Sequence, residues 1–144
     1  MFSLLGAAPA SASTLSLSES TMLAEINRTR AAHGLAPLRV DWNAQRAARA
    51  HSADMLRRGY FAHGPYVQRL QRFGLRGPRV GENIAWGAGT SSRPRAIVAM
   101  WLRSPTHRAN LLRPGFRRIG IATPRGTFAG RPNAVVVTAN FAGT

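Results

Sequence analysis

A chain of 144 residues is long enough for one domain with a buried core, and its content of 44% hydrophobic and 17% charged residues is ordinary for a soluble globular protein. It contains no cysteine, which excludes a disulfide framework, a thiolate metal site and a cysteine nucleophile. Its 20 basic residues, all of them arginine, face five acidic ones and give a formal net charge of +15.

The excess of arginine has two interpretations. It indicates a surface for anionic partners such as nucleic acid, phospholipid or an acidic cell-wall polymer. Alternatively, it reflects a genome biased toward arginine codons, with the charges spread over a solvated surface. The arginines are dispersed from Arg28 to Arg131 without a run of five like charges. This dispersion favours the second interpretation, with weak and salt-sensitive attraction to anionic surfaces.

Residues 1–15 are predicted to be the remnant of a secretory signal peptide or a disordered tail. Residues 2–8 are apolar, and residues 10–12 match the small-x-small pattern of a cleavage site, although a basic segment before them is missing. No later run is long and apolar enough to span a membrane. We therefore expect an exported protein whose domain covers residues 16–144.

Four segments are predicted to be helical, and they are residues 16–33, 42–58, 65–73 and 94–103. Ser16 and Glu19 have the spacing of a capping box for the first helix. Asp41 is the expected N-cap of the second helix and Gly59 its stop, while Ser92 is the expected N-cap of the fourth. Residues 107–112 are expected to form one short turn.

Strands are predicted toward the C-terminal end, at residues 118–122 and 135–141, with turns at 124–126 and 130–133. Residues 81–86 are too short to classify and are compatible with a strand, and residues 35–38 read as a connector. Because helices come first and strands last, the pattern predicts an α+β fold rather than alternating βαβ units.

Three residues stand out as candidates for chemistry. His63 and His107 fall in turns beside glycine and proline, where polar residues are more often functional than on helix faces. Glu82 is isolated in a glycine-flanked apolar segment, and a partly buried carboxylate needs a histidine, an arginine or a metal as partner. His51 lies on the buried-looking face of the second helix, where a hydrogen-bonded core histidine is the expected role.

Two neutral imidazoles and a carboxylate suit a divalent ion such as zinc, with room left for water. The spacing does not show that they converge, because the compact HExxH motif is absent and the three residues lie far apart in the sequence. The alternative is that each residue caps or braces its own loop.

Five blocks carry a resemblance to a known family: HSADM at residues 51–55, YFAH at 60–63, GENIA at 81–85, WLRSPTHRANLL at 101–112 and TANF at 138–141. Together they resemble the bacterial SCP-like branch of the CAP superfamily, which comprises cysteine-rich secretory proteins, antigen-five allergens and pathogenesis-related proteins. The blocks extend over about residues 20 to 142 in the family's order. The resemblance implies a three-layer α–β–α sandwich with a central antiparallel sheet.

The resemblance also implies a cleft in which family members place two histidines and two glutamates. His63 matches the first histidine, Glu82 the first glutamate and His107 the second histidine. The second glutamate falls on Ser104, so the set is reduced to a triad, as is common in bacterial members. This departure removes one anionic ligand for a metal.

Other residues of these blocks are expected to support the cleft: Ser104 and Asn83 beside it, and His51, Trp101 and Asn110 in structural roles.

The favoured function is a secreted, non-catalytic module, expected to be monomeric, whose cleft binds a small ligand such as a lipid or a cell-envelope component. The only cofactor expected is one divalent metal ion, for which zinc is the favoured choice. The first alternative is a metal-dependent hydrolase in which His63 and His107 hold zinc and Glu82 is a third ligand or a general base. The second is an arginine-driven binder of anionic polymers or surfaces. A Ser104–His107 serine mechanism and a two-carboxylate glycosidase are both disfavoured.

Overall fold

The apolar runs near the C-terminal end form the centre of a five-stranded sheet in the computed structural model, which describes residues 14–143. The strands are β1 (Arg39–Val40), β2 (Val80–Gly87), β3 (Phe116–Ala122), β4 (Arg125–Phe128) and β5 (Arg131–Gly143). The long β5 pairs antiparallel with β2, β3 and β4, and the two-residue β1 pairs parallel with β3 at the edge. The sheet is thus almost wholly antiparallel, as predicted.

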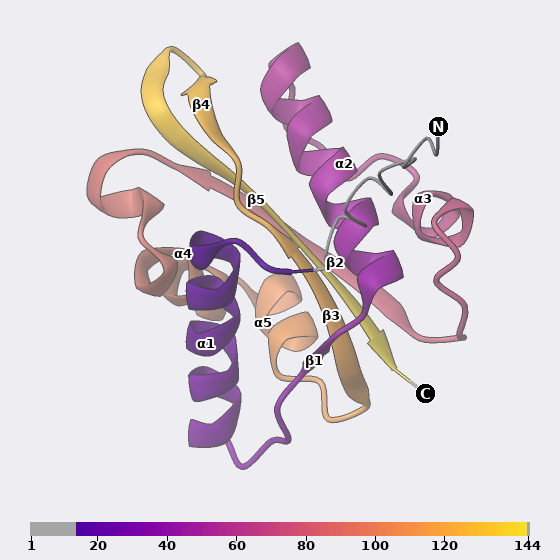
Figure 1. Ribbon diagram of the computed structural model, residues 1–144. Coiled ribbons are helices and arrows are strands. Elements are labelled where there is room, and N and C mark those ends of the chain that lie inside the picture. Colours follow the sequence, from indigo (N-terminus) through magenta and orange to yellow (C-terminus); the bar gives the residue numbers. More distant parts are fainter. Residues whose placement is uncertain (1–13, 144) are drawn as a thin grey trace, which may run out of the picture.

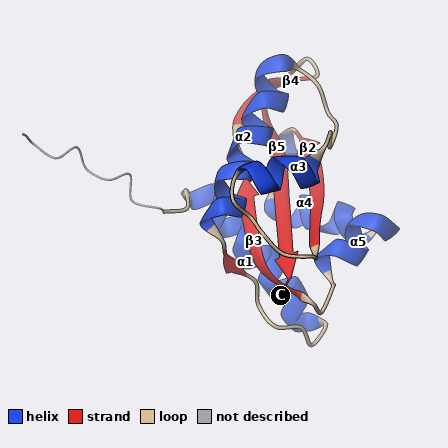
Figure 2. Cartoon of the chain, turned by 90° about the vertical axis from the view of Figure 1, so that its right-hand side faces the viewer, coloured by secondary structure: helices blue, strands red, loops and turns tan. Residues whose placement is uncertain are grey.

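Helices cover both faces of this sheet (Figures 1 and 2). The helices α1 (Leu17–Ala32), α4 (Pro94–Leu102) and α5 (Pro105–Leu111) pack on one face, and α2 (Trp42–Arg58) and α3 (Tyr66–Arg72) cover the other. This arrangement confirms the three-layer α–β–α sandwich.

The alternation of side chains along β5 explains why both faces need cover. Val135, Val137 and Phe141 point into the core shared with α1, α4 and α5. Ala134 and Val136 point to the opposite face and pack in a second cluster with α2. Since successive residues of a strand face opposite sides, a strand apolar at nearly every position is stable only between two layers.

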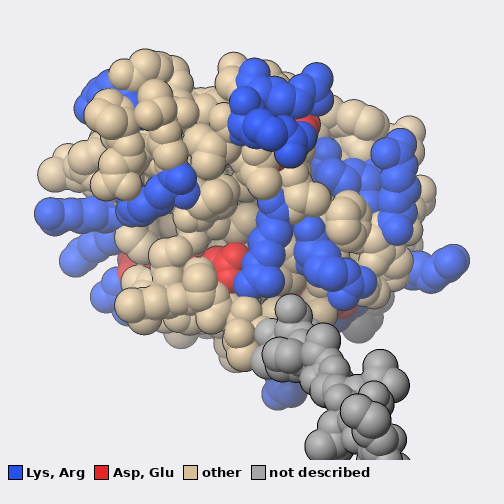
Figure 3. Space-filling view, turned by 45° about the horizontal axis from the view of Figure 1, so that its top comes forward, with Lys and Arg blue, Asp and Glu red and all other residues tan. Residues whose placement is uncertain are grey.

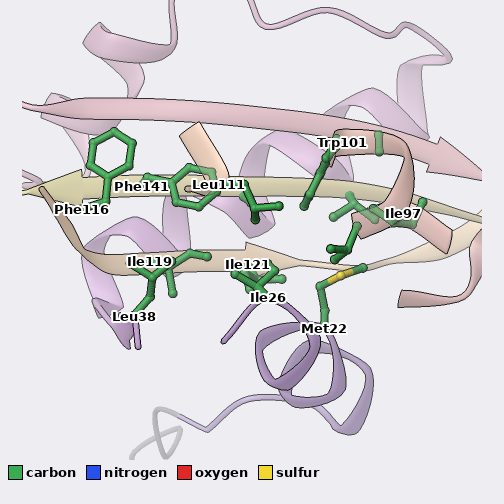
Figure 4. Packing of buried hydrophobic residues seen from close by; sticks show 14 of the residues in the cluster. Met22, Ile26, Leu38, Ile97, Trp101, Leu111, Phe116, Ile119, Ile121 and Phe141 are labelled. Carbon is green, nitrogen blue, oxygen red and sulfur yellow. The ribbon is translucent and has the colours of Figure 1, made fainter. Parts of the chain in front are cut away.

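The larger cluster fills the layer between the sheet and α1, α4 and α5 (Figure 4). Trp101 is its largest fully buried side chain, and the rings of Phe116 and Phe141 stack with their centroids 5.5 Å apart. Met22 and Ile26 from α1 meet Ile121 from β3 in the same cluster (Figure 4). Burial of these side chains is the main stabilising contribution in a chain without disulfides.

The N-terminal ends of α1 and α2 and the C-terminal end of α2 follow the predicted capping. Ser16 and Glu19 form a reciprocal capping box, in which each side chain accepts from the other residue's backbone N–H, and the Asp41 side chain accepts from two backbone N–H groups of α2. Gly59 ends α2 with a φ of +68°, a left-handed conformation that a residue with a Cβ rarely adopts.

Two local predictions around α4 and α5 are wrong. Ser92 is not the N-cap of α4: it ends a short 3₁₀ turn, η1 (Gly89–Ser92), where its hydroxyl donates to the carbonyl of Gly89 at 2.7 Å. Arg93 takes the cap position without a side-chain hydrogen bond. The segment after Ser104 is a helix rather than a single turn, because Pro105 occupies the first helical position, where proline is favourable.

The remaining differences concern strands. Two residues of the turn expected at residues 124–126 begin β4, which pairs with the first part of β5. The chain reverses at Ala129 and Gly130, both with positive φ, so the turn expected at residues 130–133 is right only in its first residue, and the rest of it begins β5. The connector after residue 38 continues into β1, which sequence reasoning missed. Residues 1–13, where the signal-peptide prediction falls, lie outside the described residues. Within residues 14–143 no helix has the length and apolar character needed to cross a bilayer.

The contact between α2 and the sheet depends on a glycine. A Cβ on Gly120 of β3 would overlap the backbone of Ala44 and Gln45 in α2. We expect Gly120→Ala to lower the free energy of unfolding by about 1–3 kcal/mol or more, because two backbones must separate. Urea denaturation measures the effect. In the matched control Gly115→Ala, the new methyl group meets only the end of the Arg79 side chain, and an equal loss there would contradict the close-packing explanation.

Candidate functional site

A cleft of about 280 Å³ opens where β2, α5 and the segment between α2 and α3 meet. Its lining residues are His63, Gly64, Tyr66, Glu82, Asn83, Thr106, His107 and Asn110. The structure therefore brings the three candidates His63, Glu82 and His107 to one place, although they come from a loop, a strand and a helix.

The carboxylate of Glu82 lies at the base of the cleft with no exposed side-chain surface. His63 Nδ1 donates to its Oε1 at 2.9 Å, and a guanidinium N–H of Arg69 donates to Oε2. Asn140, directly opposite Glu82 in the sheet, donates to Oε2 at 2.8 Å when its amide nitrogen faces the carboxylate, and its oxygen then accepts from the backbone N–H of Ala48 at 3.2 Å. The buried charge is thus paired and hydrogen-bonded on both oxygens.

His63 is the exposed part of this arrangement, with 45% of its side chain accessible. Its backbone carbonyl accepts from Arg69 at 3.0 Å, so Arg69 binds both the histidine's main chain and the carboxylate that orients its ring. Because Nδ1 donates to Glu82, the neutral ring carries its lone pair on Nε2.

His107 has a different partner. Its Nδ1 lies 2.8 Å from the hydroxyl oxygen of Ser104, the residue that occupies the place of the family's second glutamate. Burial lowers the pKa of His107, and the nearby charge of His63 lowers this pKa further. His107 is therefore neutral at pH 7, with a hydroxyl rather than a carboxylate holding its ring.

Asparagines connect the elements of the cleft. The Asn83 amide donates to the His107 carbonyl at 3.0 Å and accepts from Asn110 at 3.0 Å. Asn110, for which a structural role was expected, braces α5 against β2 in this way and also lines the cleft. Trp101 is fully buried, and its indole N–H donates to the carbonyl of Ile84 at 3.2 Å, which ties α4 to β2.

His51 lies outside the cleft. It is buried on α2, and its Nε2 donates to the carbonyl of Ala62 at 2.9 Å, one residue before His63. Its ring meets Tyr60 edge-on, with centroids 6.2 Å apart. These contacts hold the segment that carries His63 against α2. His51 is therefore a hydrogen-bonded core histidine with a structural role.

The described residues do not form a closed structural metal site. Among residues 14–143, no three histidine, cysteine, aspartate or glutamate side chains are arranged to hold a metal. Both oxygens of Glu82 already have partners, so Glu82 orients an imidazole rather than offering a ligand. What remains is the Nε2 atoms of His63 and His107, each on a ring held through Nδ1.

Sequence reasoning missed Arg69 as the partner of Glu82, and nothing distinguishes it from the other 19 arginines in the sequence. Asn140 belongs to a block that carries the family resemblance, but its role was not assigned. A signal was present, because Asn140 is an amide within the apolar run of β5 and a buried amide needs partners.

Comparison with known proteins decides the family. A family model described as "CAP: Cysteine-rich secretory protein family" matches residues 23–141. The chain belongs to the CAP family. It is similar to the uncharacterized protein YkwD of Bacillus subtilis, with 36% identity over 114 residues, which cover 76% of this chain and 43% of YkwD. This CAP chain therefore spans less than half the length of that relative.

Solved structures agree with this assignment. An extracellular protein of Bacillus anthracis that contains an SCP domain is 28% identical, with a TM-score of 0.69 over 88% of this chain and 40% of that one. The protein NaASP2, solved with Zn²⁺, shares the fold at 12% identity, with a TM-score of 0.59 over 92% of this chain and 82% of that one. The bacterial relatives confirm the resemblance to the SCP-like branch of CAP proteins.

The buried His51 makes stability depend on pH. Burial lowers its pKa below the usual value of 6.5, and the charge of Arg69 acts in the same direction. The unfolded chain therefore binds the proton more readily, so the stabilising contribution is complete above about pH 6.5 and is lost as the pH falls through the folded-state pKa. We expect His51→Gln, which keeps a donor for Ala62, to reduce the loss of stability between about pH 7 and 5, measured by denaturant unfolding.

The control is His33→Gln at the exposed end of α1, which should retain the pH dependence of the wild type. An unchanged pH dependence in His51→Gln would contradict the assignment of this titration to His51.

Proposed function

We propose that this CAP domain is exported and binds a small ligand in the cleft without catalysing a reaction on it. The observation that carries the proposal is the pair of imidazoles at the cleft, each held through Nδ1, by Glu82 for His63 and by Ser104 for His107. Around them lie side chains that donate or accept hydrogen bonds: Tyr66, Thr106 and Asn110. A concave site with a few fixed polar groups is the usual form of a small-ligand site.

A divalent ion such as zinc would be held by the Nε2 atoms of His63 and His107. When bound, it would supply a positive centre for an anionic or carbonyl oxygen of the ligand. The chain's own part is to fix the rings, since a histidine ligand whose other nitrogen is hydrogen-bonded binds in one orientation. The structure of NaASP2 with Zn²⁺ supports the choice of metal only as an example from a distant member of the fold.

The engagement of Glu82 supports a binding role over the zinc hydrolase in which Glu82 would be the general base. A general base must reach a water molecule in the site, but the Glu82 side chain is fully buried and engaged by His63 and Arg69. Ser104 and His107 do form a hydrogen-bonded pair, but no carboxylate contacts the second nitrogen of His107 among residues 14–143.

Export is supported by two independent features. The residues 10–12 have the small-x-small pattern read by signal peptidase. The similar SCP-domain protein of Bacillus anthracis is described as extracellular. The absence of cysteine fits either side of a membrane and does not bear on the choice.

Isothermal titration with zinc tests the metal part of the proposal. We expect His63→Ala and His107→Ala each to weaken zinc binding at least about tenfold, because each removes one of two ligands. Ser104→Glu should tighten binding by about tenfold, because a carboxylate then orients His107. His33→Ala is the control histidine and should bind zinc as the wild type does. Equal heats from the wild type and both cleft variants would overturn the metal assignment.

Assays of ester and peptide hydrolysis test the non-catalytic part. We expect the zinc-loaded wild type to show no hydrolysis above that of the Glu82→Gln variant. Circular dichroism checks that the variant is folded, since the amide keeps one acceptor for His63 and Arg69. Hydrolysis by the wild type that Glu82→Gln abolishes would contradict the proposal and favour the hydrolase.

A further inference from the structure

A second concavity lies between α2 and α3 on the same face of the sheet. This groove, of about 650 Å³, is lined by Ala50, His51, Ala53, Asp54, Arg57, Arg58, Tyr60, Pro65, Arg69, Arg72 and Phe73. None of these residues lines the His63–His107 cleft. Its size is within the range of cavities that hold small molecules.

Four guanidinium groups line the groove, and only two carboxylates offset them. Asp54 accepts from Arg57 at 2.8 Å and from Arg58 at 3.1 Å, while Arg69 is paired with Glu82. Arg72 ends α3, and its side chain has no ion pair or hydrogen bond to any residue in the range 14–143. The groove therefore carries an excess of about two positive charges, counted from these pairs.

The paired arginines still have donors to offer. Arg57 and Arg58 keep 73% and 66% of their side chains exposed. A guanidinium has five N–H donors, and each of these two uses one on Asp54. Asp54 also accepts from the Tyr60 hydroxyl at 2.6 Å, so it is anchored independently and holds both arginines beside the groove.

The rest of the lining is largely apolar. Ala50 and Ala53 place small side chains along α2, and Pro65 and Phe73 line the groove at the two ends of α3. Such a lining takes an apolar group more readily than a hydrated ion. His51 adds no positive charge at neutral pH, because burial lowers its pKa.

The groove also differs from the rest of the arginine-rich surface. In the view of Figure 3 arginines form several groups spread across one face of the molecule, and acidic side chains are few among them. Most exposed arginines of a convex surface point away from one another into water. Those of the groove come from two helices and border a single hollow, so one bound group can be reached from both sides.

We propose that this groove is a binding site for a phosphate monoester that carries an apolar body. Arginine binds phosphoryl oxygens through paired N–H donors, and a phosphate dianion matches the two excess charges. Arg57, Arg58 and Arg72 bind the phosphoryl group, and the apolar body lies along Ala53, Pro65 and Phe73.

The test uses 2-naphthyl phosphate as the probe, with inorganic phosphate and 2-naphthol as separate ligands, at about 0.15 M salt. Binding to the full chain is followed by naphthyl fluorescence and by backbone amide shifts in NMR spectra. We expect saturable binding of 2-naphthyl phosphate at least about tenfold tighter than that of either fragment, because both parts of the groove are then used. The amide shifts should be concentrated in α2 and α3.

Two double variants locate the site. Arg57→Gln with Arg72→Gln should weaken binding of 2-naphthyl phosphate about tenfold or more. The matched control, Arg95→Gln with Arg103→Gln, removes the same charge from exposed positions on α4 and at its C-cap in the opposite layer and should leave binding unchanged.

Equal weakening in both double variants would overturn the proposal by showing a response to net charge alone. So would inorganic phosphate that binds as tightly as the ester, or amide shifts confined to the His63–His107 cleft. The zinc titration and this test have separate readouts, so the failure of one does not decide the other.

Discussion

The pairing of the buried Glu82 carboxylate is the constraint on which the site depends. A carboxylate without exposed surface is costly unless its oxygens are bonded, and three groups from different segments meet that requirement: His63, Arg69 and Asn140. The loop before α3, α3 itself and β5 are thereby held at one strand, β2. The same bonds orient the His63 ring toward the cleft, so the interaction that satisfies the charge also builds the site.

The parts of the fold that follow from local chemistry could be predicted. The capping box at Ser16, the cap at Asp41 and the stop at Gly59 act within a few residues of themselves, so the sequence alone reveals them. The strands β1 and β4 could not be found in this way. Both are short, and they exist because partners elsewhere pair with them: Ile119 with Val40, and Ala134 with Gly126. These strands depend on tertiary pairing rather than on a local sequence pattern, and the residues around Gly126 are typical of a turn.

The main residues of the candidate site could be singled out from the sequence, but the hydrogen bonds between them could not. His63 and His107 stood out because turn and proline contexts isolate them, and Glu82 because acidic residues are scarce. Which group satisfies the carboxylate could not be deduced, since Arg69 is one of 20 arginines and its role depends on how α3 sits against β2. The family resemblance implied that His63, Glu82 and His107 share one cleft. It also showed that Ser104 stands where the family has its second glutamate.

Scarcity of acid gives the high charge of this chain its physical meaning. Each of the five acidic side chains is paired with at least one arginine; they are Glu19, Glu25, Asp41, Asp54 and Glu82. No acidic side chain is therefore left to neutralise the remaining arginines. Most arginines are therefore exposed to water, where salt screens their charge and each contributes little to the binding of an anion. Attraction becomes specific only where guanidinium groups border a concave, partly apolar surface. A bound anion there is contacted from several directions, and its attraction to the guanidinium groups is screened less by the solvent. The total charge speeds the encounter with anions, and local geometry decides which of them remains bound.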